Sequence, residues 1–172
     1  MLHVIQRLIT AILTIPATQD WIYAALLLLI YAVISLPIGL KYRFIQFDIQ
    51  SSRKIVAAVM LGALVMPGIT EELFFRVLLL PHPTENASLA AQLIWGSISL
   101  IVFIVYHPLN IFAPGHDVTF RNPVFLLLAA LLGIVCTVSY LQSGSLWPPV
   151  VIHWLIVVVW LLLLGGYREL HG

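Results

Sequence analysis

Long apolar segments, separated by short connections rich in turn residues, constrain this chain more than any other feature. A helix needs about 20 mainly apolar residues to cross about 30 Å of hydrocarbon, at about 1.5 Å per residue. Four or five segments meet this requirement, and they cover residues 21–40, 55–80, 88–106, 123–141 and 147–165. Because 62% of the residues are hydrophobic and only 9% are charged, an ordinary water-soluble domain is excluded. The sequence predicts an all-α, polytopic transmembrane helical bundle of about five spans.

The remaining residues fit a single membrane-embedded domain over residues 1–172. The first 16 residues contain one Arg and a short apolar stretch at 8–15, and no small-x-small cleavage site follows before Asp20. We expect this region to form an N-terminal interfacial helix rather than a cleaved signal. A net charge of +1 creates no global basic field, so nucleic acid is not an expected partner, whereas the lipid bilayer is.

The distribution of Lys and Arg predicts how the bundle is oriented. Four positive residues fall in the connection 41–54, and positive residues are retained in cytoplasmic loops. We therefore predict that loop 41–54 is cytoplasmic in a multi-pass integral membrane protein. Alternation of the spans then places Arg121 and Arg168 on the same side, whereas the opposite loops, around Asn86 and Gly144, contain no Lys or Arg.

Three ionisable residues lie together in the second apolar segment, in the sequence Thr70-Glu-Glu-Leu-Phe-Phe-Arg76. Each such group costs about 2.5 to 3.5 kcal/mol at the centre of a membrane helix, so the cluster must face the interior of the bundle. Glu72 and Arg76 are four residues apart and can pair on one helix face, as a structural ion pair that locks helix packing. Glu71 points about 100° away from Glu72 and has no partner nearby in the sequence. It is therefore available as a general acid or base.

Two histidines extend this pattern onto other segments. His107 closes the third segment, in Phe103-Ile-Val-Tyr-His107, and His153 lies within the last one. A single His in such a place is commonly a hydrogen-bonded packing residue. Two imidazoles and one or two carboxylates on separate helices can instead activate a water, either directly or through a bound metal. The single cysteine, Cys136, has no disulfide partner and is expected to act as a small buried hydrophobic residue.

These residues form three motifs in a fixed order. The motifs are Glu71-Glu72-Leu-Phe-Phe-Arg76, then Phe103-x-x-x-His107, then Ser143-Gly-Ser-Leu-Trp147-Pro with His153 six residues after Trp147. Together they resemble the successive motifs of the CPBP family. This is the CAAX protease and bacteriocin-processing family, also called Abi, which includes type II CAAX prenyl endopeptidases. The resemblance covers about residues 60–160 and implies an intramembrane endopeptidase that cleaves a peptide or protein substrate, in some members a prenylated one.

The resemblance also implies a role for each residue. Glu71 and His107 would activate a water for attack on the scissile carbonyl, and Glu72 and Arg76 would form an orienting pair. His153 would stabilise the oxyanion, a role usually shared with an Asn four residues further on. Position 157 is Val here. A donor that contributes on the order of 3 kcal/mol to the transition state must therefore come from elsewhere or be absent, and the substitutes considered are Asn110 and Thr137.

Metal use and activity are left open by the sequence. A catalytic zinc needs about three protein ligands and an open position, and Glu71, His107 and His153 could supply them. The chain has no His-Glu-x-x-His pair, and we favour a glutamic mechanism without a cofactor. His116 and Asp117 are a further ligand pair, in a loop. Beside the protease we consider a catalytically impaired membrane scaffold or immunity-type protein of the same fold, suggested by Val157, and a proton-coupled transporter.

The expected segment boundaries conflict with the motifs in one respect. At about 1.5 Å per residue, Glu71 and His153 lie roughly 9 to 14 Å from one end of their segments. His107 closes its own segment, toward the opposite face. A break of the second span at Pro67-Gly68, or a different start of the third, would remove the conflict.

Overall fold

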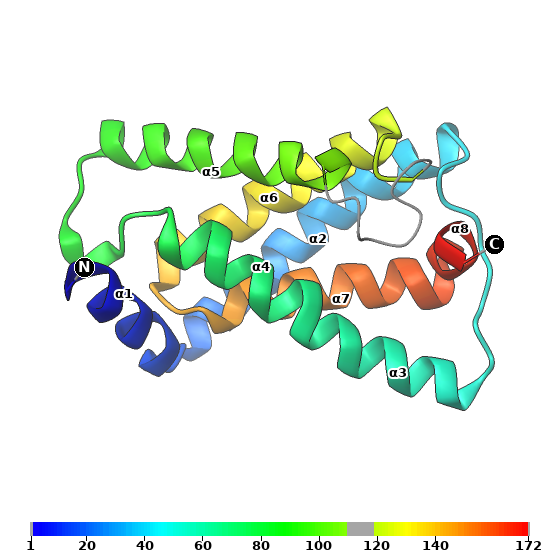
Figure 1. The fold of residues 1–172 in the computed structure, drawn as a ribbon, viewed down its shortest axis with the longest axis horizontal. Coiled ribbons are helices and arrows are strands. Elements are labelled where there is room, and N and C mark those ends of the chain that lie inside the picture. Colours follow the sequence, from blue (N-terminus) through cyan, green and yellow to red (C-terminus); the bar gives the residue numbers. More distant parts are fainter. Residues whose placement is uncertain (1, 110–118, 172) are drawn as a thin grey trace.

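The computed structural model describes residues 2–109 and 119–171 and confirms an all-helical membrane bundle (Figure 1). Within these ranges every regular element is a helix, apart from an isolated β-bridge between Asp48 and Leu164. The α-helices are α1 (Leu2–Leu13), α2 (Thr18–Lys41), α3 (Arg53–Ala63), α4 (Thr70–Glu72), α5 (Leu89–Leu109), α6 (Pro123–Ser143), α7 (Trp147–Leu163) and α8 (Gly166–His171). Two π-helical turns, η1 (Leu64–Ile69) and η2 (Leu73–Leu78), flank α4, and the 3₁₀ turn η3 (Pro83–Glu85) follows.

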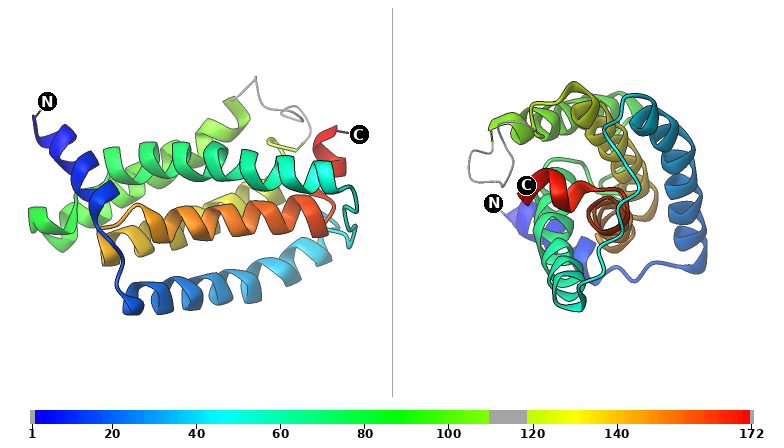
Figure 2. Two further views of the ribbon diagram at one scale, coloured as in Figure 1. Left: turned by 90° about the horizontal axis from the view of Figure 1, so that it is seen from below. Right: turned by 90° about the vertical axis from the view of Figure 1, so that its right-hand side faces the viewer.

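Four segments of the described chain are long and apolar enough to cross a membrane, namely Thr18–Lys41, Arg53–Glu85, Leu89–Leu109 and Pro123–Ser143. Helix α7, with 17 residues, is a shorter apolar helix. Only 11–17% of the residues in the most apolar part of the first three spans are buried, as in helices that contact lipid, whereas the share in α6 is 44%. Viewed end on, α7 lies among α2, α3 and α6, all of which it contacts (Figure 2). The protein is therefore a multi-pass integral membrane protein.

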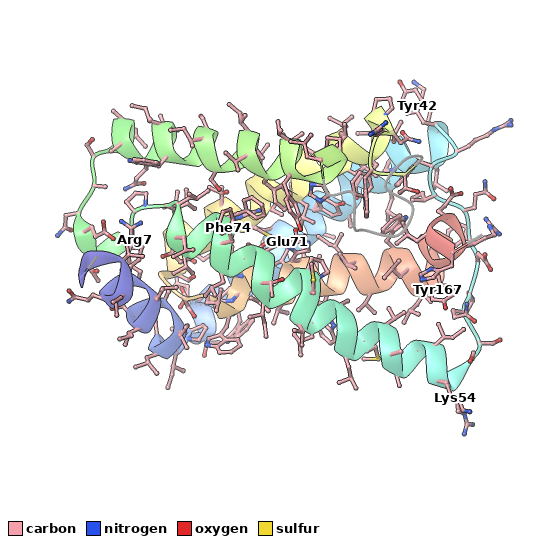
Figure 3. All side chains as sticks on the ribbon, viewed as in Figure 1. Arg7, Tyr42, Lys54, Glu71, Phe74 and Tyr167 are labelled. Carbon is pink, nitrogen blue, oxygen red and sulfur yellow. The ribbon has the colours of Figure 1, made fainter. Side chains whose placement is uncertain are left out.

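The helices alternate in direction, so their connections gather at two ends of the bundle. Figure 1 shows the connection after α2, the start of α6 and helix α8 at one end, and α1 and η3 at the other. Figure 3 places Lys54 at the first end and Arg7 at the second. Arg168 donates to Asp48 across 2.8 Å, which ties α8 to the connection 41–54. The basic residues of this connection thus share one end with Arg121 and Arg168, as alternation of the spans predicts.

The expected N-terminal helix is present and is fastened to the connection between α6 and α7. Its last turn and the residue that follows it offer backbone carbonyls to three donors: Ala11 to the Leu146 N–H (2.9 Å), Ile12 to the Trp147 Nε1 (3.0 Å) and Thr14 to the Ser145 hydroxyl (2.8 Å). Ala11 is fully buried and packs with Val77 and Leu80, at the end of the second span. The Ser-Gly-Ser-Leu-Trp motif therefore anchors α1 beneath the segment that carries the ionisable cluster.

The second span is broken at Met66, as the Pro67-Gly68 pair predicts. Met66 is extended (φ −136°, ψ 113°), because the ring of a following proline disfavours helical backbone. Gly68 lies at a close approach just after the break. A Cβ at this position would lie 2.9 Å from the Ala63 carbonyl oxygen and 3.6 Å from the Trp154 Cβ. The break thus brings the start of α4, with both glutamates, against α7.

We expect Gly68→Ala to lower the thermal midpoint of the protein in detergent, because the new methyl would collide with the Ala63 backbone, which cannot rotate away. Gly62→Ala is a matched control six residues earlier, since a Cβ at Gly62 meets nothing within 4 Å. Removing a helical glycine at an open position stabilises by roughly 0.5 to 1 kcal/mol. Equal melting of the two variants, measured by intrinsic fluorescence, would contradict the packing at the break.

Candidate active site

Glu72 lies at the centre of a buried polar network. Its Oε1 is 2.6 Å from Nδ1 of His153, and its Oε2 is 3.2 Å from Nε of Arg76. The side chains of Glu72 and Arg76 are fully buried and that of His153 is 3% exposed. The expected Glu72–Arg76 pair is present, and the same carboxylate also binds an imidazole on α7. Glu72 therefore joins the second span to α7.

Arg76 has two further contacts that hold its guanidinium. Nη2 donates to the Gly133 carbonyl across 3.3 Å, and the guanidinium carbon lies 4.7 Å from the centre of the Phe103 ring. A Cβ at Gly133 would lie 2.7 Å from Leu100 Cδ1, so glycine permits the close approach of α6 to α5 there. A carboxylate, a carbonyl and an aromatic face together compensate the buried charge, which is costly to leave alone.

Glu71 faces another side of the helix and lines a cavity of about 810 Å³ with mostly apolar walls. Its side chain keeps 11% of its exposure, and its Oε2 lies 4.0 Å from Nε2 of His153. This oxygen forms no hydrogen bond within the described part of the chain. Figure 3 places Glu71 near the middle of the bundle's length. The two neighbouring glutamates are thus divided as predicted, one in the ion-pair network and one open to the cavity.

His107 lines the same cavity from α5. Its Nδ1 lies 2.8 Å from the Phe103 carbonyl oxygen. Because a carbonyl only accepts, Nδ1 carries the proton of this bond, and Nε2 of the neutral ring keeps a lone pair. The Phe103 ring packs edge-on against both imidazoles, with centroids 4.8 Å from His107 and 6.1 Å from His153. Glu71, His107 and His153 therefore reach one cavity from three separate helices.

The conflict over the depth of His107 is resolved by two features of α5. The helix continues to Leu109, so the expectation that His107 closes its segment was wrong. Pro108 lies inside the last turn of α5, although it has no N–H to donate to the carbonyl four residues earlier. The whole helix is also displaced along the bundle toward the end that holds η3 (Figures 1 and 2). Its C-terminal turn consequently lies beside the middle of the bundle, level with the glutamates.

Residues 53–159 match the model of the family described as type II CAAX prenyl endopeptidase Rce1-like. The chain belongs to this family. The match confirms the resemblance carried by the three motifs and covers α3 to most of α7, including every residue of the network and the cavity residues Glu71 and His107. No curated protein and no solved structure matches the chain. Membership indicates a protease kind of activity toward a protein or peptide at the membrane.

The cavity of this Rce1-like protein is also lined by residues with hydroxyl groups that the motifs did not indicate. Tyr31, Ser35 and Tyr106 line it, together with Val157, which lies one turn after His153. Thr137 faces α5 instead, since its methyl group is 3.7 Å from the position of a Cβ at Gly96. Asn110, His116 and Asp117 lie outside the described residues. The polar donors on the cavity wall in the described chain therefore come partly from α2, a helix that carries none of the three motifs.

Metal-ligating atoms of the described chain come together in one group, Glu72, Cys136 and His153, whose atoms lie within 4.8 Å of one another. In this Rce1-like protein all three are buried, and each already has a partner. Glu72 binds both Arg76 and His153, and the Cys136 thiol donates to the Pro149 carbonyl across 3.6 Å. This group is not the set expected for a zinc ion, which was Glu71, His107 and His153. Zinc binding by that set stays a prediction. Cys136 is fully buried, as its sequence context predicts.

Proposed function

We propose that this protein is an intramembrane endopeptidase of the glutamic type, which hydrolyses peptide bonds with a water activated by Glu71 and His107. The observation that carries the proposal is the convergence of a carboxylate and two imidazoles, from three helices, on one apolar cavity in an Rce1-like chain. Hydrolysis in a membrane needs a secluded place for water, and polar groups in such a cavity provide it. Membrane proteins rarely retain ionisable side chains without a functional reason.

Water activation is assigned to the two groups with a free proton acceptor. Glu71 Oε2 has no hydrogen-bond partner in the described chain, and neutral His107 has its Nε2 lone pair available. The water oxygen bonds to the scissile carbonyl carbon while one of its protons moves to this pair. The tetrahedral intermediate then breaks its C–N bond, and the leaving amine takes the proton. Such acid–base assistance contributes about 10² to 10⁴-fold in rate.

His153 is assigned to the oxyanion. Its Nδ1 is fixed by Glu72, which leaves Nε2 beside Glu71 at 4.0 Å. Nε2 is thus the ring nitrogen on the cavity side, and we assign its N–H as a donor to the developing charge. Glu72 and Arg76 act indirectly in this scheme, by holding the imidazole.

The cavity also supports a proposal about how substrate enters. Its lining extends from Glu71 to Phe44, Leu164 and Leu170, near the end of the bundle that carries the basic residues. We place this end, with loop 41–54, in the cytoplasm, because positive residues are retained there. Apolar walls suit a substrate with a prenyl group close to its cleaved bond. We therefore propose entry of a prenylated C-terminus from the cytoplasmic side.

The alternative is a catalytically impaired scaffold with the same fold, and a specific observation favours testing it. Val157 lines the cavity next to His153 and has no hydrogen-bond donor. A scaffold needs the buried Glu72 network for stability but has no use for a proton acceptor at Glu71 or His107. The two functions therefore differ in what substitution of the cavity residues does.

We expect His107→Ala to reduce cleavage of prenylated model peptides by about 10²-fold in detergent or nanodiscs, because half of the proton-accepting pair is lost. His171→Ala is the control, since His171 is exposed on α8 at the end of the bundle. A zinc chelator is expected to leave cleavage unchanged. Loss of activity with chelator and its recovery with zinc would overturn the metal-free mechanism. Failure of the unsubstituted protein to cleave prenylated and unprenylated peptides alike would support the scaffold.

A further inference from the structure

The carbonyl of Phe75 does not accept from the Leu79 and Leu80 N–H groups, which follow it by four and five residues. In an α-helix it would accept from the Leu79 N–H, and in a π-helix from the Leu80 N–H. Both of these groups donate to the Arg76 carbonyl instead, Leu80 across 2.9 Å. Neither of the donors that an α-helix or a π-helix would supply therefore reaches this carbonyl, which directly precedes the arginine of the network.

Ser99 of α5 supplies the missing donor. Its hydroxyl oxygen lies 2.6 Å from the Phe75 carbonyl oxygen, and the residue is fully buried. Because a carbonyl only accepts, the serine donates this bond. A buried acceptor without water or protein partners is unfavourable, so the bond fixes where η2 can lie relative to α5.

Ser99 also belongs to a row of residues that contact the site from α5. Ser99, Phe103 and His107 are spaced four residues apart and share one helix face. Ser99 binds the Phe75 carbonyl, the Phe103 ring contacts the Arg76 guanidinium, and His107 reaches the cavity. The Phe75 and Phe103 rings pack edge to face, with centroids 5.0 Å apart. One face of α5 thus sets the position of both the network and one wall of the cavity.

We propose that Ser99 is a positioning residue of the active site. By binding the Phe75 carbonyl it fixes the backbone of Arg76, and the chain of contacts from Arg76 through Glu72 holds the His153 imidazole beside Glu71. The expected effect of Ser99 on kcat rests on the proposed function, whereas its effect on the position of the buried network does not. The residue lies outside the three motifs and touches no group that reacts.

The kinetic test compares variants of Ser99 that differ in the hydroxyl. Ser99→Thr and Ser99→Val have nearly the same shape, so only the hydroxyl separates them, and Ser99→Ala removes it with the least added volume. We expect Ser99→Val and Ser99→Ala to lower kcat by about 10-fold or more, with little change in KM, because small misplacements of reacting groups are costly. Ser99→Thr should recover most of the loss. Ser97→Ala, at an exposed position on the same helix, is the matched control and should behave like the unsubstituted protein.

A second readout is independent of activity. Cys136 is the single cysteine, is fully buried, and has its thiol within 4.8 Å of the ligand atoms of Glu72 and His153. Its rate of alkylation by N-ethylmaleimide therefore reports loosening of the network. We expect a rise of about 5-fold or more in Ser99→Ala and Ser99→Val, since alkylation requires local opening, and a rate near the unsubstituted one in Ser99→Thr and Ser97→Ala.

The two readouts separate this proposal from the proposed function. Alkylation that rises only when the hydroxyl is lost, in a protein that cleaves no peptide, would support positioning by Ser99 and reject the protease. Equal kcat and equal alkylation in the Thr and Val variants would overturn the role of Ser99. If Ser99→Ala does not fold, the comparison of Thr with Val still decides the matter.

Discussion

Glu71→Gln is expected to lower kcat/KM for peptide cleavage by about 10² to 10⁴-fold, the range of a general base. The amide has the shape of the carboxylate but cannot take a proton from water. The fold should be preserved, because Glu71 Oε2 makes no hydrogen bond in the described chain and the side chain faces a cavity. Cleavage is measured with the same peptides as for the unsubstituted protein, and folding by the thermal midpoint in detergent.

Glu169→Gln is a suitable control for this substitution. It makes the same chemical change on α8, where the side chain is exposed at the end of the bundle. We expect its kcat/KM to equal that of the unsubstituted protein. Full activity in Glu71→Gln would remove the glutamate from the mechanism and leave His107 alone as the proton acceptor. A thermal midpoint clearly lower than that of the unsubstituted protein, together with the loss of rate, would point to a structural role instead.

The second large effect concerns stability. Glu72→Met and Arg76→Met are each expected to destabilise the protein by about 3 to 5 kcal/mol, because the first leaves the Arg76 charge buried without a carboxylate and the second removes the only cation paired with Glu72 on its own helix. Both side chains are fully buried, and Glu72 also holds His153. The double substitution Glu72→Met with Arg76→Met should cost less than the sum of the two, since it leaves no unpaired charge from this pair. The free energy of unfolding in mixed detergent micelles measures all three.

The chain contains its own comparison for this prediction. Arg7 and Glu85 form a second Arg–Glu pair at 2.6 Å, with side chains 17% and 40% exposed, at the end of the bundle. Exposed pairs contribute about 0 to 1 kcal/mol, so Arg7→Met should cost far less than Arg76→Met. Similar losses for the two arginines would show that burial does not govern the strength of the Glu72–Arg76 pair.

The spans and the local ion pair could be predicted because they depend on short-range rules. Apolar run length indicates where a helix can cross lipid, and a spacing of four residues brings Glu72 next to Arg76. The contact of Glu72 with His153 could not be found in this way. It joins residues 81 positions apart, on two helices whose mutual rotation depends on the break at Met66.

The predicted depth of His107 in the bundle was wrong for a related reason. Span boundaries were inferred as if every helix were centred in the same slab, whereas α5 is displaced along the bundle and extends past its proline. The role of Ser99, by contrast, is partly indicated by the sequence. A polar residue in an apolar helix, four and eight positions before Phe103 and His107, shares their face and indicates a contact there. Its partner, a backbone carbonyl, is invisible in any sequence pattern.

The junction between α1 and the rest of the bundle bears on how this sequence can evolve. Ile12 and Thr14 contribute only their main-chain oxygens, so almost any side chain can replace theirs while the hydrogen bonds persist. The side chains that bind α1 belong instead to Ser145 and Trp147. Both donate hydrogen bonds, and both lie inside the range matched to the family. Ala11 alone is restricted, by its complete burial. Among orthologues we therefore expect substitutions to accumulate freely at the end of α1 while its docking site stays fixed.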